Sequence, residues 1–272
     1  MNRIVSVDLK ADFGFLKKPD TNDPIYLTFN MLHKPALIGI FGAILGLGGF
    51  SESKKEEKKR KKGEATNNEE LLPEYYKLLN SLKVGIKPIN EKVENFNGNF
   101  EKTIIKYNNG VGFANLDGGN LIVVEQTLIN PSFRCYFLVE TALHEKLAEY
   151  LKENKAEFLP YLGKNDFSIW WDNYQEYKAE EFNSLNESFK LDTIFIKKKV
   201  LKDGLKELDD MQLLMGESGN TFVYFENLPT EYQIELMQYS YQPFAYTDWN
   251  LKQNYHVENL FKLSNNETIQ IF

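Results

Sequence analysis

The stretch "KPALIGIFGAILGLGGF", Lys34 to Phe50, decides the fold of this chain. From Pro35 onward it has no charged side chain, and it contains five glycines. A membrane span needs about 20 apolar residues, which is more than this glycine-broken run offers. A dinucleotide-binding loop needs the spacing GxGxxG directly after a strand, and the glycines here are spaced differently. The run therefore predicts a buried helix that begins near Pro35 and stops at Gly48 and Gly49.

The glycines inside this predicted helix carry a cost. Each one destabilises a helix by roughly 1 kcal/mol relative to alanine. Such a cost is best explained where another part of the chain must approach the helix closely. We therefore expect the helix to be tightly packed against a neighbouring segment.

Composition describes an ordinary globular protein with a core of its own. The chain has 272 residues, of which 42% are hydrophobic and 26% are charged. Its single cysteine, Cys135, excludes an internal disulfide and a cysteine-built metal site. The first residues, "MNRIVSVDLK", are typical of a strand and carry charges too early for a signal peptide. These features predict a cytoplasmic protein that does not enter a membrane.

Charge is unevenly distributed along the chain. The net charge is −7, yet residues 1–62 hold 12 Lys and Arg against 7 Asp and Glu. Affinity for phosphate depends on where the cations lie rather than on the total. A basic end on an acidic body is compatible with local phosphate binding, and also with a solvated surface of mixed charge.

The order of predicted elements indicates an α+β fold. A first strand, the glycine-rich helix, a strand near residues 84–89, further strands at residues 121–138 and an amphipathic helix in "ETALHEKLAEYLKEN" follow one another. This order is typical of a ferredoxin-like or RRM-type domain, which we assign to residues 1–190. The lysine-rich segment 51–70 is a charged insertion whose only apolar residue is Ala65. Residues 191–272 are predicted to form a small β-rich C-terminal domain.

Motifs for catalysis are weak. "DFG" at Asp12 lacks the other kinase motifs, and "HEKLA" at His144 lacks the second histidine of a zinc protease helix. The three histidines, which include His33 and His256, have no ligand spacing. We therefore predict no catalytic residue, no metal site and no cofactor.

Several stretches together resemble one family. "FGFLKKPDTN" and "KPALIGIFGAILG" resemble the N-terminal signature of the Cas-five proteins, which belong to the RAMP superfamily and are subunits of CRISPR Cascade complexes. "EQTLINPSFRCYF" and "PYLGKNDF" resemble later blocks of the family, in the same order and at similar spacing. The resemblance covers about residues 3–170. "FENLPTEYQIELMQYSYQPFAYTD" is similar to the C-terminal part of the type I-B branch.

This resemblance implies an RRM-like RAMP domain and a role in antiviral defence. Family members bind the 5′ handle of the CRISPR RNA, and contact the backbone subunit and the large PAM-reading subunit. Target DNA is therefore an indirect partner. A long β-hairpin, the thumb, folds over the RNA, and we place it within residues 87–119 because that stretch is polar and rich in Asn and Gly.

Candidate RNA-binding residues follow from the chemistry of this ligand. Handle binding needs hydrogen-bond donors for phosphates and flat side chains for splayed bases. For stacking, Phe13, Phe15 and Phe29 are available, although a core position is the alternative for each. The candidate donors, each with a structural role as its alternative, are Lys17, Lys18, His33, Lys34 and Arg134.

A nuclease remains the main alternative function. The type I-C branch of the family cleaves repeat RNA without metal, using Tyr, Lys and His. The downstream Lys-His pair of that branch is absent here, and the only adjacent pair is His33–Lys34. We therefore predict a non-catalytic, type I-B-like scaffold subunit. A metal-independent endoribonuclease is the alternative, and an unrelated globular interaction protein is the third possibility.

Overall fold

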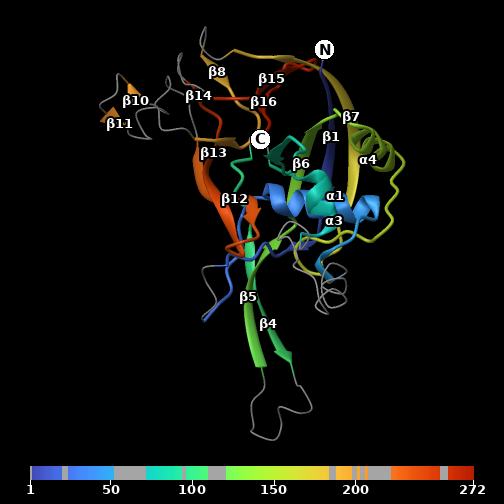
Figure 1. The fold of residues 1–272 in the computed structure, drawn as a ribbon. Coiled ribbons are helices and arrows are strands. Elements are labelled where there is room, and N and C mark those ends of the chain that lie inside the picture. Colours follow the sequence, from blue (N-terminus) through green and yellow to red (C-terminus); the bar gives the residue numbers. More distant parts are fainter. Residues whose placement is uncertain are drawn as a thin grey trace, which may run out of the picture.

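A computed structural model describes residues 2–19, 24–51, 72–93, 96–109, 121–183, 188–197, 201–202, 206–207, 222–251 and 257–272. Within these residues, most of the regular structure is β, with three helices gathered on one side (Figure 1). The charged insertion at 51–70 falls, from residue 52 on, outside the described residues. Within the described part, no helix is both long and apolar enough to cross a membrane.

The centre of the fold is a six-stranded antiparallel sheet. Its strand order is β16-β15-β7-β1-β6-β3. On β1, Val5, Val7 and Leu9 join the main core, while Ser6 and Asp8 alternate with them and point to the other face. The strands are β1 (Asn2–Lys10), β3 (Val84–Pro88), β6 (Ser132–Leu138), β7 (Trp170–Glu181), β15 (Leu260–Leu263) and β16 (Thr268–Gln270).

Helices cover only one face of this sheet. They are α1 (Lys34–Leu45), α3 (Glu74–Leu79) and α4 (Ala142–Lys152). The rings of Phe41 on α1 and Phe137 on β6 meet edge to face, with centroids 5.6 Å apart. The glycine-rich run is therefore the buried helix that its composition predicts.

The end of α1 differs from the prediction. The helix ends at Leu45 because Gly46 adopts a left-handed conformation with φ 77°. There the N–H of Leu47 donates to the carbonyl of Gly42 at 2.9 Å, which closes the helix before the predicted stop at Gly48 and Gly49. The prediction was wrong because all three glycines could terminate a helix, and the sequence does not show which one takes positive φ.

Close packing explains the internal glycines of α1. A Cβ at Gly42 would lie 2.5 Å from the Cβ of Tyr75 on α3, so only glycine fits there. A Cβ at Gly39 would make an ordinary contact, 3.8 Å from the Tyr75 ring. The expected tight approach is thus confirmed at Gly42, where α3 crosses α1.

A long hairpin projects from the body of the molecule (Figure 1). It consists of β4 (Lys102–Asn109) and β5 (Leu121–Ile129), and β2 (Phe13–Gly14) pairs with β5 at its base. The interval 87–119, in which we expected the thumb, contains β4, whereas β5 follows it. The first residues of that interval belong to β3 in the central sheet, and residues 110–120 lie outside the described part.

The C-terminal part is built onto the same sheet. Two of its strands, β15 and β16, extend the sheet beyond β7. The aromatic ring of Phe244 contacts that of the C-terminal Phe272 at 4.8 Å, and Phe244 belongs to the main core. Residues 191–272 therefore share sheet and core with the first part. The other strands are β8 (Phe189–Lys190), β9 (Phe195–Ile196), β10 (Leu201–Lys202), β11 (Lys206–Glu207), β12 (Val223–Gln233), β13 (Gln238–Thr247) and β14 (Asn250–Leu251).

The two glycines of α1 give a matched test of this packing. We expect Gly42→Ala to lower the free energy of unfolding by about 1–3 kcal/mol, because the clash with Tyr75 outweighs the gain in helix propensity. Gly39→Ala should raise it by up to about 1 kcal/mol. Urea unfolding of both variants measures the two effects. Equal stabilisation by the two substitutions would show that α3 does not approach α1 as described.

Candidate nucleic-acid interface

A broad groove of about 790 Å³ lies beside α1. Two of the predicted RNA-binding residues, Lys17 and His33, line it. Its other walls are the outward side of α1 and the loop that contains Tyr161 and Lys164. The groove therefore joins segments that the sequence places far apart.

Backbone hydrogen bonds hold the first wall in place at the base of the hairpin. The N–H of Lys18 donates to the carbonyl of Leu27 at 2.8 Å. The N–H of Phe29 donates to the carbonyl of Leu16 at 2.7 Å. The N–H of Tyr26 in turn donates to the carbonyl of Val124 on β5 at 2.9 Å. The segment that carries Lys17 is thus anchored to the hairpin.

Gly163 allows the opposite wall to close against this segment. Its φ is +84°, and a Cβ there would lie 1.7 Å from the carbonyl oxygen of Phe15. The N–H of Phe15 also donates to the carbonyl of Leu162 at 3.1 Å. The "PYLGKNDF" block therefore needs glycine at residue 163, because only glycine permits this approach.

Two lysines line the groove, and one of them is paired with a carboxylate. Lys17 is exposed, and its Nζ lies 3.9 Å from the centroid of the Tyr26 ring. The Nζ of Lys164 lies 3.8 Å from the centroid of Tyr107 on β4 and 2.7 Å from Oε2 of Glu125 on β5. Sequence reasoning missed Lys164, although it stands inside the "PYLGKNDF" block that was singled out for its resemblance.

Exposed aromatic and apolar side chains accompany these lysines. Phe50, Phe158 and Tyr161 line the groove and are each more than two-fifths exposed. By contrast, the predicted stacking residues Phe15 and Phe29 are buried core residues. Phe13 is exposed but does not line the groove, and its ring contacts Phe167 at 5.8 Å.

His33 has a structural task. Its Nδ1 accepts a hydrogen bond from the N–H of Ala36 at 3.3 Å and so caps α1. Burial lowers the pKa of His33 to about 3, because the charged ring would be cut off from water. The imidazole is therefore neutral at physiological pH.

Lys18 and Lys34 are engaged inside the molecule. Lys18 pairs with Glu226 on β12 at 3.1 Å, and the same carboxylate accepts from the N–H groups of Asn30 and Met31. The Nζ of Lys34 donates to the carbonyl of Phe272 at 3.3 Å. Burial lowers the pKa of Lys34, and the negative charge of Glu231 acts in the opposite direction.

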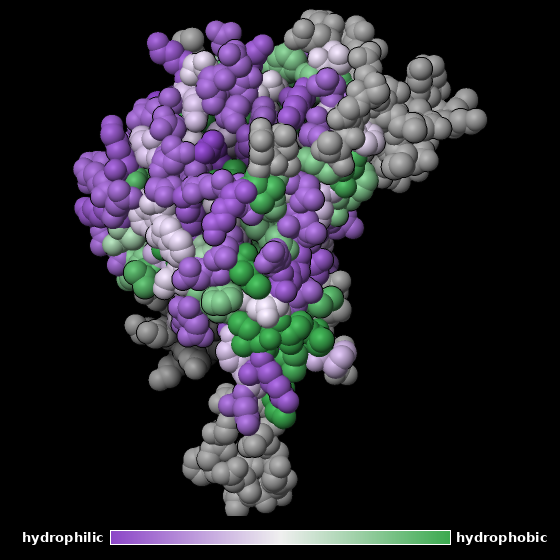
Figure 2. All heavy atoms as spheres, turned by 180° about the vertical axis from the view of Figure 1, so that it is seen from behind, coloured by the Kyte–Doolittle hydropathy of each residue, from purple (hydrophilic) through white to green (hydrophobic). Residues whose placement is uncertain are grey.

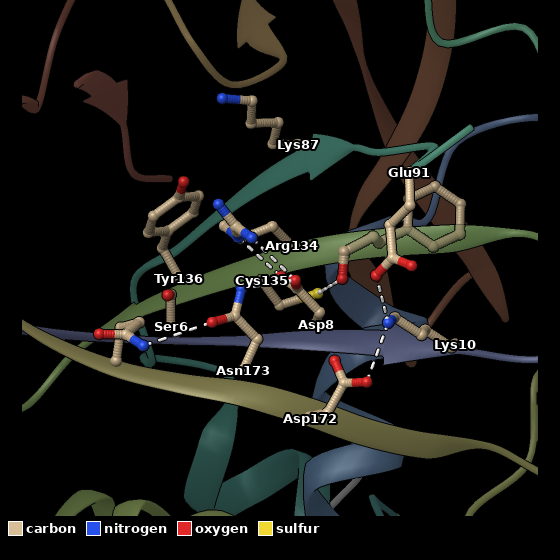
Figure 3. A network of polar contacts seen from close by, with 12 residues as sticks. Ser6, Asp8, Lys10, Lys87, Glu91, Arg134, Cys135, Tyr136, Asp172 and Asn173 are labelled. Atoms are coloured by element: carbon tan, nitrogen blue, oxygen red, sulfur yellow. Dashed lines mark hydrogen bonds and ion pairs between the residues drawn. The ribbon is translucent and has the colours of Figure 1, made fainter. Parts of the chain in front are cut away.

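Arg134 lies apart from the other predicted residues, on the sheet face that the helices leave open. Its Nε and Nη2 donate to the two carboxylate oxygens of Asp8 at 2.6 and 2.8 Å (Figure 3). This hydrogen bond to Asp8 raises the pKa of Arg134 further above its usual range. The structure therefore places Lys17 and His33 in one groove and Arg134 in a separate pocket.

In the ranges that the structure describes, no group of three or more His, Cys, Asp or Glu side chains could hold a metal ion.

Comparisons with known proteins find similarity in structure only. No family model matches the chain, and no curated protein matches it. Among solved structures, a "CRISPR RNA-guided surveillance complex" chain is 11% identical, with a TM-score of 0.44 over 93% of this chain and 92% of that one. A CRISPR protein from Archaeoglobus fulgidus is 12% identical, with a TM-score of 0.40 over 99% and 98% of the two chains. A chain of the type III-B Cmr-beta complex bound to cognate target RNA is 11% identical, with a TM-score of 0.43 over 92% and 86%. These structural neighbours are CRISPR-associated, at low sequence identity.

The buried His33 predicts a pH-dependent stability. Its folded-state pKa of about 3 is below the unfolded value of about 6.5, so the unfolded chain binds the proton first. Stability from this residue is therefore complete above about pH 6.5 and is lost as the pH falls towards 3. We expect the wild type to lose about 2–3 kcal/mol more than His33→Asn between pH 7 and about 4.5.

Urea unfolding at several pH values measures this difference. Asparagine is a suitable control because it also caps helices. Parallel pH profiles for the two proteins would mean that His33 is solvated in the folded state.

Proposed function

We propose that the chain is a non-catalytic subunit of a type I Cascade, similar to type I-B, that binds the 5′ handle of the CRISPR RNA. The proposal rests on the four sequence blocks that resemble the Cas-five proteins and on one structural observation. That observation is the groove beside α1, where Lys17 and Lys164 flank exposed aromatic side chains at the base of the hairpin.

This combination suits single-stranded RNA. Proteins bind such RNA by pairing cations with the backbone and by stacking splayed bases on aromatic rings. Lys17 and Lys164 supply the cations, while Phe158 and Tyr161 supply exposed rings. Both lysines also rest on tyrosine rings, which holds their ammonium groups at the edge of the groove.

The topology supports the RRM-type part of the proposal. Within the sheet, the order β7-β1-β6-β3 is that of a ferredoxin-like domain, with α1 between β1 and β3 and α4 between β6 and β7. We take the β4–β5 hairpin as the thumb that would fold over the RNA. β15 and β16 are then additions at the β7 edge.

The hairpin is also a candidate contact for a neighbouring backbone subunit. Ile104 and Ile122 lie on the same face of it by strand register, and each is about half exposed. Figure 2 shows apolar side chains gathered where the hairpin leaves the body. In this proposal the large PAM-reading subunit and the target DNA meet the chain only within the assembled complex, in the cytoplasm.

The environment of the histidines favours a scaffold over a metal-independent endoribonuclease. A general acid or base needs a pKa near the operating pH. His33 is buried, neutral and used as a helix cap, and its neighbour Lys34 is held by the carbonyl of Phe272. Burial also lowers the pKa of His144. His256 lies outside the described residues.

The groove lysines give the first test. We expect the double variant Lys17→Ala, Lys164→Gln to bind a repeat-derived 5′-handle RNA more weakly. The slope of log K against log salt should become shallower by about 1.4, since each phosphate contact on single strands contributes about 0.7. Glutamine at residue 164 can still donate to Glu125. Fluorescence anisotropy over a salt series measures both quantities.

A matched control comes from the α4 region. Lys146 and Lys155 also rest on a tyrosine ring, that of Tyr150, but neither lines the groove. The double variant Lys146→Ala, Lys155→Ala should leave handle affinity and its salt slope unchanged. Equal losses in both double variants would remove the groove from the proposed site.

Cleavage in the absence of metal separates the two functions. We expect the chain alone to leave a labelled repeat RNA intact in EDTA, and to bind mature RNA when it is co-expressed with its partner subunits. Gel analysis with mapping of the RNA 5′ ends measures the outcome. Cleavage by the isolated chain that is lost in His33→Asn would establish the nuclease instead.

A further inference from the structure

The open face of the sheet carries a second, smaller pocket around Arg134. It encloses about 340 Å³ and lies between β1, β6 and β7 and the segments that precede β9 and follow β13. None of the groove residues discussed above lines it. The pocket is therefore separate from the proposed handle site, and the inference below goes beyond that function.

Arg134 offers a fixed pair of donors to this pocket. Asp8, almost completely buried, occupies the Nε and Nη2 edge of the guanidinium. Nη1 has no hydrogen-bond partner among the described residues. The Nη1 and Nη2 edge of the guanidinium thus remains available for a ligand that presents two acceptors side by side.

Asn173 fixes this arrangement at a cost in backbone energy. It lies at a β-bulge, where the register between β1 and β7 shifts, and has a positive φ of 52°. Its Nδ2 donates to Oδ2 of Asp8 at 2.9 Å (Figure 3). Bulges and strained residues are over-represented at functional sites, and this one points its amide at the carboxylate that orients Arg134.

The charges around the pocket oppose an anionic ligand. Four carboxylates line it: those of Asp8, Glu91, Asp192 and Asp248. Three cations line it as well, namely Lys87, Arg134 and Lys190. Lys87 is opposite Arg134 on the neighbouring strand and is already paired with Glu267 at 2.8 Å and with Asp192 at 3.6 Å. A neutral polar group fits this balance better than a phosphate does.

Aromatic side chains give the pocket flat walls. Phe96, Phe222 and Tyr246 line it, and the rings of Phe222 and Tyr246 are 5.4 Å apart. Flat apolar walls together with donors and acceptors match a nucleobase, which has a stacking face and a polar edge.

We propose that this pocket binds a guanine base of single-stranded RNA. The open edge of Arg134 would donate to guanine O6 and N7, which is the commonest specific contact between arginine and a base. The N1–H and the amino group of guanine are donors, and the carboxylates in the walls can accept from them. Adenine lacks the paired acceptors that this arginine requires.

The neighbouring surface favours RNA over a free nucleoside. The pocket shares Asn90, Phe96 and Phe222 with an adjacent cavity of about 700 Å³ along the same face. That cavity is also lined by the exposed ring of Trp170 and by Ser132. The buried Oγ of Ser132 has no hydrogen-bond partner among the described residues. Further nucleotides of a strand could continue into this cavity.

Base preference in short RNAs tests the proposal. We compare the affinity of the full chain for the heptamers UUUGUUU, UUUAUUU and UUUUUUU by fluorescence anisotropy. The guanine heptamer should bind roughly tenfold more tightly than the other two, as expected for one bidentate contact. In Arg134→Lys, which keeps the charge but loses the fork, the preference should disappear. Equal affinities for the three heptamers in the wild type would overturn the proposal.

Two controls make the outcome specific. If Arg134→Lys does not fold, the double variant Asp8→Asn, Arg134→Met removes the ion pair without leaving a buried charge, and the same loss of preference is expected. The variant Lys17→Ala, Lys164→Gln should retain the guanine preference. This result distinguishes a failure of the handle proposal from a failure of the guanine proposal. Guanosine that raises the thermal midpoint of the wild type, with no preference among heptamers, also overturns the proposal, because the pocket would then bind a free nucleoside and not RNA.

Discussion

The close packing of α1 against α3 is the constraint on which the rest of the structure depends. Gly42 leaves room for Tyr75, so α3 can press on α1 at a distance that no other residue would allow. With α1 fixed, its capping residue His33 and the chain before it are fixed as well. The groove beside α1 is then the space left between this helix, the Lys17 segment and the loop at Gly163. The helix whose glycine permits close packing with α3 therefore also forms one edge of the candidate interface.

The two faces of the sheet have different roles in this molecule. One is covered by helices and supplies the main core, and the groove opens at its margin. On the other face, a separate apolar cluster forms around Tyr136 and includes residues of β15 and β16. The same face carries the ion pair between the buried Asp8 and the partly exposed Arg134. The pair lines the pocket proposed for a guanine base.

Charge in the candidate groove is local and modest. Lys17 is exposed, whereas Lys164 is paired with Glu125, Lys18 is paired with Glu226, and Lys34 donates to the carbonyl of Phe272. Such a surface suits a ligand that contributes bases for stacking as well as phosphates. The overall charge of −7 is no obstacle, because the acidic residues need only lie elsewhere.

The sequence by itself determined the buried glycine-rich helix, the helix at residues 142–152 and the strand at the N-terminus, because apolar periodicity and glycine content act locally. It also gave the right expectation of a tight contact at an internal glycine. Only the tertiary structure decided which partner each predicted donor has. Lys18, Lys34 and Arg134 contact Glu226, Phe272 and Asp8, which are more than a hundred residues away in the chain. Lys164 is likewise placed beside Glu125 and Tyr107 of the hairpin. The tertiary fold determines the partner of each charged side chain, and the local sequence pattern does not show which distant segments come together.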